Sequence, residues 1–419
     1  MTIAVAGVTG FRNRGVEALA LPILTFLRQR TPAQAVTLLT WTPEVDQQRI
    51  SWPDLTLQPT AFRRFSAPTP PPSSQTRLRL AIKALLRRSP ERPSEPGLID
   101  PALARQLRGH RVLIVTGGDV YSSEYGHDSL LYYLSLIHTA AREGLIVVLL
   151  GHTVGRFHDP AQEQAWRSAV AHVSLLTTRD RLTYDYLQQI GGLARRTEIC
   201  ADVAFALPAA HSVPRQGFSD PHRPLLALAL SAGLHRWSTI SAVQHQAGWR
   251  HLLEVAVERW GLNVLLIPHV QETYGDDRSL ATALHRATGF HPAVAVAAED
   301  LSAAEYKRLI AGCQMLVAER MHAAIAGLSS RVPTALVAYS LKARALAAMA
   351  YAGLAPGPER MVIPTDTLSQ PASLESRLHD LWQTRQESQA ALQRNLPHLQ
   401  QLAQANFTHL EALLHGAGL

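Results

Sequence analysis

Short apolar runs alternate with longer amphipathic stretches along the first half of the chain. We predict strands for the apolar runs at 3–6, 35–39, 112–115, 146–150 and 173–177. Between these runs, apolar residues recur at helical spacing, which predicts helices over 15–28, 128–143 and 159–171. Alternation of this kind is typical of βαβ units wound around a parallel sheet.

The alternation is interrupted at 208–224, where four prolines and a glycine accumulate, and it then restarts. Beyond the break the pattern predicts a helix over 241–259 and strands over 225–230, 263–267, 293–297, 315–318 and 334–338. We therefore predict two doubly wound α/β domains, residues 1–208 and 222–419, with a ligand cleft at the carboxyl ends of their strands. The second domain ends in helices, and Pro397 is expected to break or kink the last of them.

The positive charge of the chain is local. The net charge is +7, and residues 61–97 alone carry eight basic and two acidic side chains, beside a proline cluster at 68–72. A basic insert of this kind does not indicate a nucleic-acid surface over the whole protein. Within it, 76–86 is predicted to form a helix with one apolar side. We interpret this helix as a solvated surface element; the alternative is contact with anionic lipid or a lipid-linked substrate.

Composition excludes several classes of protein. Hydrophobic residues make up 47% and charged residues 17% of the chain, which is ordinary for a globular protein and unlike a disordered one. No apolar stretch approaches the roughly 18 residues that a membrane span needs, and the opening residues favour a strand over a signal peptide. Because Cys200 and Cys313 are far apart, we predict neither a disulfide nor a zinc site, and a cytoplasmic location.

The turn after the first predicted strand, residues 7–17, is rich in glycine and leads into a helix. Such a turn lets backbone N–H groups at the helix start approach an anion, although close packing of strand and helix explains it equally well. Its G-x-x-G spacing differs from the dinucleotide fingerprint, so no nicotinamide or flavin site is indicated.

Polar side chains follow three other predicted strands of the first half. Gly117, Gly118 and Asp119 come after 112–115, and the next polar residues could hydrogen-bond sugar hydroxyls: Tyr121, Ser122, Glu124 and Tyr125. A tight loop capped by the aspartate is the alternative. Gly151–Phe157 follows the next strand, and Arg179–Asp180 the one after it. Arginine can bind phosphate or carboxylate bidentately, whereas the alternative here is a structural ion pair.

The most informative segment is the predicted strand 315–318 running into a helix rich in small residues. Glu319, Arg320 and His322 stand together at that junction. The helix dipole lowers the pKa of a nearby imidazole and a bound phosphate raises it, so this histidine is a candidate for proton transfer. The strand 334–338 likewise ends in polar groups, with Lys342 a candidate phosphate contact.

Taken in order, these segments resemble the polysaccharide pyruvyl transferase family over roughly residues 1 to 355. The motifs that carry the resemblance are N-x-G-x-E-A at 13–18, Gly-Gly at 117–118, G-x-x-x-G-x-F at 151–157, R-D at 179–180, D-x-A-F at 202–205, I-P-H at 267–269 and R-x-H at 320–322, followed by Tyr339 and Lys342. The usual family pattern is not kept at Val16, Asp119 or Arg156, all in predicted substrate loops.

The resemblance implies two Rossmann-like domains facing a central cleft (GT-B-like) and phosphoenolpyruvate as donor, with no metal or redox cofactor. His322 would be the general acid, and Arg320 and Arg179 would hold the donor's phosphate and carboxylate. The implied substrate-binding positions are Asn13, Gly15, Glu17, Gly117, Gly118, Asp119, Thr153, Gly155, Asp180, His269, Glu319, Tyr339 and Lys342.

The expected acceptor is a sugar of a surface polysaccharide or of its lipid-linked precursor. Two other functions stay open: a nucleotide-sugar glycosyltransferase on the same architecture, and a non-catalytic family member that binds a glycan. The acceptor sugar, the ketal linkage and the oligomeric state are open as well. We expect no nucleic-acid partner, and peripheral contact with an anionic membrane only through the basic insert.

Overall fold

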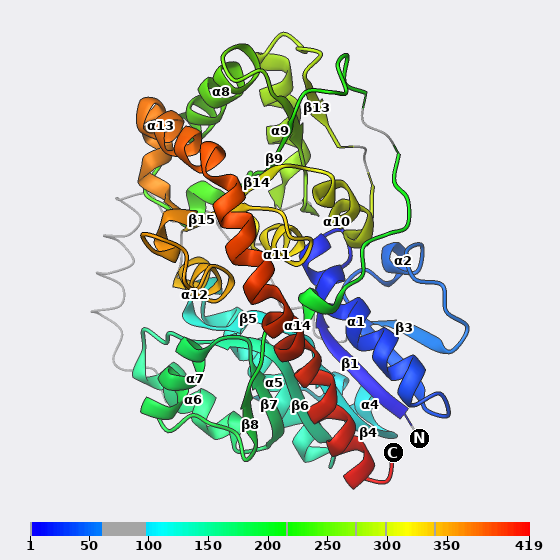
Figure 1. The fold of residues 1–419 in the computed structure, drawn as a ribbon. Coiled ribbons are helices and arrows are strands. Elements are labelled where there is room, and N and C mark those ends of the chain that lie inside the picture. Colours follow the sequence, from blue (N-terminus) through cyan, green and yellow to red (C-terminus); the bar gives the residue numbers. More distant parts are fainter. Residues whose placement is uncertain (1, 61–97, 215–216, 273–274, 298–299, 339–340) are drawn as a thin grey trace, which may run out of the picture.

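A computed structural model describes residues 2–60, 98–214, 217–272, 275–297, 300–338 and 341–419. The basic insert at 61–97, with its predicted helix, and Tyr339 lie outside the described residues. Two parallel sheets, each with helices on its faces, form the two halves of the molecule (Figure 1). The predicted class, two Rossmann-like α/β domains, is confirmed.

The first sheet has the strand order β3-β2-β1-β4-β6-β7-β8, with β5 beside β6. Its strands are β1 Thr2–Val8, β2 Ala35–Thr40, β3 Leu55–Pro59, β4 His110–Val115, β5 Gly118–Tyr121, β6 Ile146–Val154, β7 Val173–Thr178 and β8 Thr197–Ile199. The helices around it are α1 Arg14–Arg30, α2 Pro43–Asp46, α4 Pro101–Leu107, η2 Ser123–Tyr125, α5 His127–Arg142, α6 Pro160–Val170, α7 Arg181–Gln189 and η3 Val203–Ala206.

The second sheet has the order β13-β10-β9-β14-β15-β16, and a small hairpin of β11 and β12 stands apart from it. Its strands are β9 Leu225–Ala229, β10 Asn263–Leu266, β13 Val294–Val296, β14 Met315–Ala318, β15 Thr334–Ala338 and β16 Val362–Pro364, and the hairpin is Gln271–Glu272 with Gly275–Asp276. The helices are η4 Leu234–Arg236, α8 Ala242–Glu258, α9 Asp277–Ala287, α10 Ala303–Ala311, α11 Met321–Ser329, α12 Leu341–Ala350, η5 Pro358–Met361, η6 Thr365–Ser369, α13 Pro371–Gln383 and α14 Arg385–Gly416.

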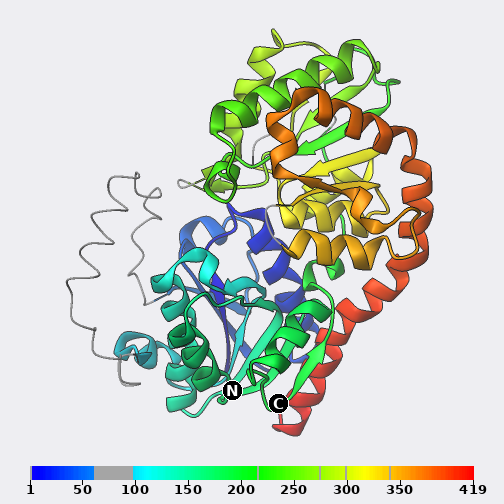
Figure 2. The ribbon, with the colours of Figure 1, turned by 90° about the vertical axis from the view of Figure 1, so that its left-hand side faces the viewer.

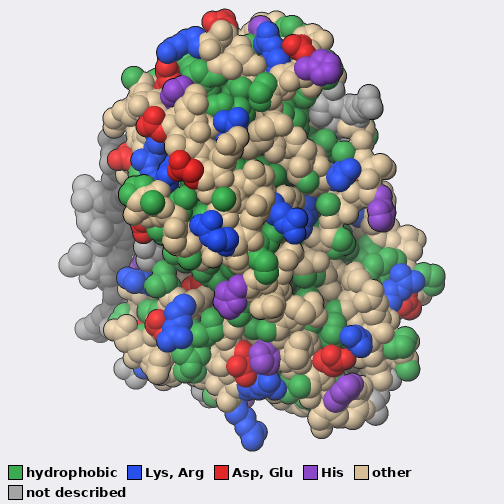
Figure 3. Space-filling view, in the orientation of Figure 1, with side chains coloured by type: hydrophobic (Ala, Val, Ile, Leu, Met, Phe, Trp, Pro, Cys, Tyr) green, Lys and Arg blue, Asp and Glu red, His purple; other side chains and the backbone are tan. Residues whose placement is uncertain are grey.

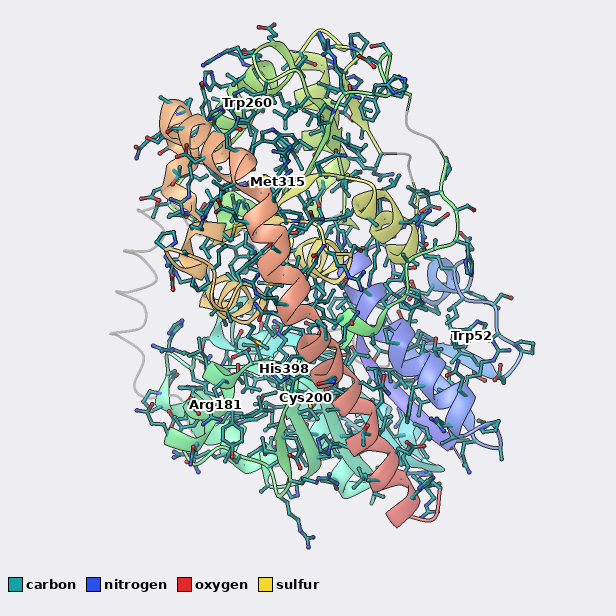
Figure 4. All side chains as sticks on the ribbon, viewed as in Figure 1. Trp52, Arg181, Cys200, Trp260, Met315 and His398 are labelled. Atoms are coloured by element: carbon teal, nitrogen blue, oxygen red, sulfur yellow. The ribbon has the colours of Figure 1, made fainter. Side chains whose placement is uncertain are left out.

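The apolar runs form strands because parallel sheets are covered on both faces. Each residue of β14, including Met315 labelled in Figure 4, is buried, and so are most residues of β1, β4 and β6. Residues 2–199 supply the first sheet and 225–364 the second, on either side of the predicted break. The carboxyl ends of the central strands therefore lead into loops between the two sheets.

The expectation that Pro397 would break the last helix is wrong, since α14 continues through it to Gly416. Leu392, Leu396 and Leu399 are all buried on either side of the proline, and this packing outweighs the single lost backbone hydrogen bond.

The same helix also crosses from the second half of the molecule to the first (Figures 1 and 2). Asn406 accepts a hydrogen bond from Thr177 Oγ1 at 2.5 Å and donates one to the Ala201 carbonyl at 2.8 Å. The end of α14 therefore packs on the first sheet, and the two chain termini lie near each other.

The two halves are also joined through the turn after β1. Asn13 forms an isolated β-bridge with Val270, and the Gln271 N–H donates to the Arg12 carbonyl at 3.0 Å. The buried Arg14 guanidinium donates to the Leu301 carbonyl at 2.5 Å. Burying this charge at the seam is compensated by several hydrogen bonds, so the turn fixes one half against the other.

None of the described helices combines the length and the apolar character that a membrane span requires. On the face shown in Figure 3, side chains of both charges and hydrophobic side chains are interspersed.

Candidate active site

Arg179 stands at the carboxyl end of β7 and is the centre of a buried polar cluster. Its Nη1 donates to Asp202 Oδ2 at 2.7 Å, and its Nε donates to Thr153 Oγ1 at 2.7 Å. Burial lowers the pKa of this guanidinium, but Asp202 and Asp119 more than offset that effect and raise it. Nη2 makes no hydrogen bond to the described residues, so it can bond to an anion that enters the site.

The alternative that Arg179 pairs with Asp180 is not what the structure shows. Asp180 is the N-cap of α7 and accepts a hydrogen bond from the Thr183 N–H at 2.7 Å. Its second oxygen accepts from Thr153 Oγ1 at 3.1 Å. Asp180 therefore fixes the strand–helix turn, and Thr153 links it to the arginine.

A cavity lies beside this cluster, between the two halves of the molecule. The cavity is small, since its empty space comes to about 350 Å³ only when the part open to solvent is included. Its lining residues are Thr153, Arg179, Asp180, Ala201, Asp202, Phe205, Met321, Ile325, Lys342, Ala345, Leu346 and Met349. The wall contributed by α11 and α12 is mostly apolar, and the polar groups gather at the end of β6 and β7. An apolar wall facing a few convergent polar groups is typical of small-molecule sites.

His322 is the second residue of α11 and approaches the cluster from the other domain. The side chain is 19% exposed, and its Nε2 atom is buried and has no hydrogen-bond partner among the described residues. Asp202 Oδ2 lies 3.9 Å from this atom. Burial lowers the pKa of the imidazole, Asp202 opposes the shift, and Arg179 adds to it. The ring is therefore held beside charged groups with one nitrogen available for chemistry.

Gly15, the second residue of α1, faces the opposite edge of the His322 ring. A Cβ atom added there would clash with Nδ1 of His322. This steric requirement explains the glycine of the N-x-G motif, and it differs from the anion contact expected from the sequence. Asn13 caps the same helix by accepting from the Gly15 N–H at 3.0 Å.

We expect Gly15→Ala to lower turnover at least tenfold while leaving the melting temperature nearly unchanged. The new methyl group displaces the imidazole, and a misplacement of about 1 Å can cost a hundredfold in rate. Alanine is otherwise the better helix residue by about 1 kcal/mol, which offsets the strain. Steady-state kinetics and thermal melts check this, with Gly416→Ala in the last turn of α14 as control, because a Cβ added there meets no other atom. Unchanged kinetics would remove the steric role.

Lys342, in α12, lines the cavity from the second half of the molecule. Its ammonium group is bonded to the carboxylates of Asp119 and Glu124 in the other half of the molecule. Burial alone would raise the pKa of Asp119, but Lys342 and Arg179 lower it overall. The lysine expected to contact phosphate is thus an ion-pair partner across the domain boundary.

Arg320 occupies a different place from the one that the sequence indicated. Its Nε donates to Asp277 Oδ2 at 2.9 Å and its Nη2 to Oδ1 at 2.5 Å. Asp277 also accepts from the backbone N–H groups of Ala232 and Val270. This fork-to-fork pair lies within the second domain and holds the start of α11, so the structure separates Arg320 from the cavity lined by Arg179.

Glu319 is a buried structural carboxylate. It accepts from the Ser231 N–H at 2.6 Å, from His245 Nε2 at 2.7 Å and from Trp249 Nε1 at 2.8 Å. All three partners belong to the second domain, so the expected substrate contact is corrected: Glu319 anchors the end of β14 and thereby the start of α11.

The remaining candidates mostly shape the backbone. A Cβ at Gly117 would clash with the Gly151 and Leu150 carbonyls, and a Cβ at Gly155 would clash with the Tyr186 ring. At both positions the glycine is required by neighbouring protein atoms. Gly118 has φ +111° and pairs with His152 in the sheet.

Glu17 and His269 lie at the seam between the halves. Burial raises the pKa of Glu17 to about 7, and its carboxylate accepts from the Ala303 N–H at 3.0 Å. His269 is buried, and burial lowers its pKa well below the usual value. Neither lines the cavity. Of the other sugar-binding candidates, Tyr121 is fully buried.

Asp202 is the site residue that sequence reasoning left out, although the D-x-A-F motif contains it. It lies between Arg179 and His322 and caps η3 through the Ala204 N–H at 2.9 Å. No motif in the sequence pointed to Asp277, the ion-pair partner of Arg320. Across the part of the chain that the structure describes, no three His, Cys, Asp or Glu side chains gather as a metal site.

Known proteins resemble this chain in sequence and in fold. A family model for polysaccharide pyruvyl transferase matches residues 13–340. The amylovoran biosynthesis protein AmsJ of Erwinia amylovora is 22% identical over 249 residues, which cover 57% of this chain and 59% of that protein. The match thus spans less than two thirds of the relative.

Solved structures of similar fold include a UDP-GlcNAc 2-epimerase from Neisseria meningitidis (TM-score 0.59, 11% identity, 99% of this chain and 100% of that chain). A second is the S. aureus MnaA–UDP structure (TM-score 0.61, 10% identity, 99% and 96%), and a third is the calicheamicin glycosyltransferase CalG4 (TM-score 0.53, 15% identity, 99% and 98%). At such low identity these likenesses establish the fold, that of two-domain glycosyltransferases and epimerases.

Proposed function

Because the chain belongs to the polysaccharide pyruvyl transferase family, we propose that it transfers the pyruvyl group of phosphoenolpyruvate to two hydroxyls of one sugar in a surface polysaccharide or its lipid-linked precursor. The observation that carries the proposal is the buried, unpartnered Nε2 of His322 beside the Arg179–Asp202 pair. A candidate proton donor thus lies beside the Arg179–Asp202 pair, and both residues of that pair line the cavity.

The reaction needs a proton at the methylene carbon of the donor. His322 in its protonated form delivers that proton, which makes a methyl group and leaves an oxocarbenium-like centre at C2. One sugar hydroxyl adds to C2, the C–O bond to phosphate breaks, and the second hydroxyl closes the ketal. Of the two hydroxyl protons, one returns to the imidazole and the other leaves with inorganic phosphate, so the steps balance.

Arg179 is the group suited to the donor's anionic end. Its guanidinium stays charged, is held rigidly by Asp202 and Thr153, and lines the cavity. Preorganised charge of this kind is worth more in an enclosed site than in water. The N-terminus of α11 adds backbone N–H groups that receive no side-chain cap, and these favour a nearby anion. Arg320, paired with Asp277, acts by positioning α11.

Isothermal titration of the purified protein with phosphoenolpyruvate tests the proposal, with UDP and GDP as controls. We expect saturable binding of phosphoenolpyruvate, weakened at least tenfold in Arg179→Lys, because lysine does not reproduce the forked guanidinium. Release of phosphate on addition of a glycan acceptor would follow.

Binding of a nucleotide instead of phosphoenolpyruvate would overturn the donor assignment in favour of a glycosyltransferase. Binding of neither, with a glycan still bound, would favour a non-catalytic member. A cytoplasmic location and membrane contact through 61–97 stay predictions of the sequence.

A further inference from the structure

Two of the large hydrophobic side chains that the structure shows exposed contact each other. Tyr125 is 43% and Trp237 41% exposed, and their rings meet nearly edge to face, with centroids 5.4 Å apart and planes at 69°. Tyr125 ends η2 in the first half of the molecule, and Trp237 follows η4 in the second. The pair therefore bridges the two domains at the surface.

The aromatic pair is linked to the cavity through Lys342. The Tyr125 hydroxyl is 2.9 Å from both carboxylate oxygens of Asp119. The Lys342 ammonium lies 6.0 Å from the centroid of the Tyr125 ring and is bonded to Asp119 and Glu124. Lys342 also lines the cavity with Arg179, so this one side chain connects the aromatic pair to the cavity.

We propose that Tyr125 and Trp237 form the acceptor subsite, on which a hexopyranose ring of the glycan stacks with its hydroxyls toward the cavity. A pyranose offers a face of C–H groups to an aromatic ring and a rim of hydroxyls to charged groups. Tyrosine and tryptophan combine a large apolar surface with a polar atom, which suits them to such amphipathic ligands. This inference rests on the proposed function, because it names where that reaction's acceptor lies.

Three features favour a sugar over a protein partner. Two rings make a patch much smaller than the several hundred Å² of typical protein docking surfaces. Carboxylates and an ammonium group flank it, and these are donors and acceptors for hydroxyls. Asp119 also fixes the orientation of the Tyr125 ring through its hydroxyl, so little side-chain entropy is lost when a ligand stacks there.

Titration of the full chain with methyl β-glycosides of glucose, galactose, mannose and N-acetylglucosamine, followed by tryptophan fluorescence and calorimetry, tests the subsite. At least one glycoside should bind saturably. Trp237→Ala and Tyr125→Ala should weaken that binding at least tenfold while changing phosphoenolpyruvate affinity less than twofold. Tyr125→Phe keeps the ring and should lose less.

Phe290→Ala is the matched control, because Phe290 is 58% exposed and packs on His285 in the second domain. It should bind the sugars like the wild type. The inference is overturned if no glycoside binds, if Trp237→Ala binds as tightly as the wild type, or if UDP competes for the rings as a nucleobase would. Sugar binding that persists without phosphoenolpyruvate binding would instead contradict only the donor assignment.

Discussion

His322→Ala is expected to lower turnover by about 10²- to 10⁴-fold, the usual contribution of a positioned proton donor. The fold should persist, because Nε2 of His322 has no hydrogen-bond partner among the described residues and its loss leaves no polar group stranded. Phosphate release in the presence of donor and acceptor measures the turnover, and thermal unfolding measures the fold. Near-normal turnover in this variant would remove the proposed mechanism.

The same residue predicts the direction of the pH dependence. A general acid must be protonated, and burial lowers the pKa of His322 below its usual value of 6.5. In the free enzyme kcat/KM should therefore be highest at acid pH and fall tenfold per pH unit as the pH rises through that pKa. The bound anionic donor stabilises the imidazolium, so the corresponding fall in kcat should lie at higher pH.

Asp202→Asn separates this explanation from others. Asp202 raises the pKa of His322. Replacing it with a neutral residue should therefore move the fall in kcat/KM to lower pH. If the fall in kcat/KM stays at the same pH in this variant, or is still present in His322→Ala, the titrating group is not His322. Two candidates for such a group are His152, whose pKa burial lowers to about 4, and Glu17, whose pKa burial raises to about 7.

The fold could be predicted because continuous apolar runs are the signature of buried parallel strands. Strands such as β1 and β14 were found to within two residues at each end. β3 and β8 were not predicted, since both are short and only partly buried and thus carry no apolar run. The break expected at Pro397 does not occur, because local propensity is weaker than the packing of the leucines around it.

Sequence reasoning selected several residues that lie near the cavity, but it did not predict which residues they contact. Arg179, His322 and Lys342 could be selected because they follow strands whose carboxyl ends share one edge of a sheet. Their partners depend on how two domains meet: Asp202 and His322 are 120 positions apart, and no local pattern links them. Glu319 stands next to Arg320 in sequence yet turns into the core, because neighbours at a strand end point to opposite sides.

Arg179→Ala is the second change with a large expected effect, and it acts on stability and on activity by different routes. The variant leaves Asp202, which is 3% exposed, without its main ion-pair partner. Breaking a buried pair in this way costs about 3–5 kcal/mol. Affinity for phosphoenolpyruvate should fall by two orders of magnitude or more, since one charged hydrogen-bonded contact is worth about 2–5 kcal/mol.

The double variant Arg179→Ala/Asp202→Ala distinguishes the two roles. Removing the stranded carboxylate should restore much of the lost stability, because an uncharged pair no longer leaves a buried charge without a partner. Donor binding should not return, since no cation remains on that wall of the cavity. Denaturant unfolding and calorimetry with phosphoenolpyruvate measure the two quantities in each variant. If binding recovered together with stability, Arg179 would be a structural residue only, and the donor would have to be held elsewhere, with the N-terminus of α11 the next group to examine.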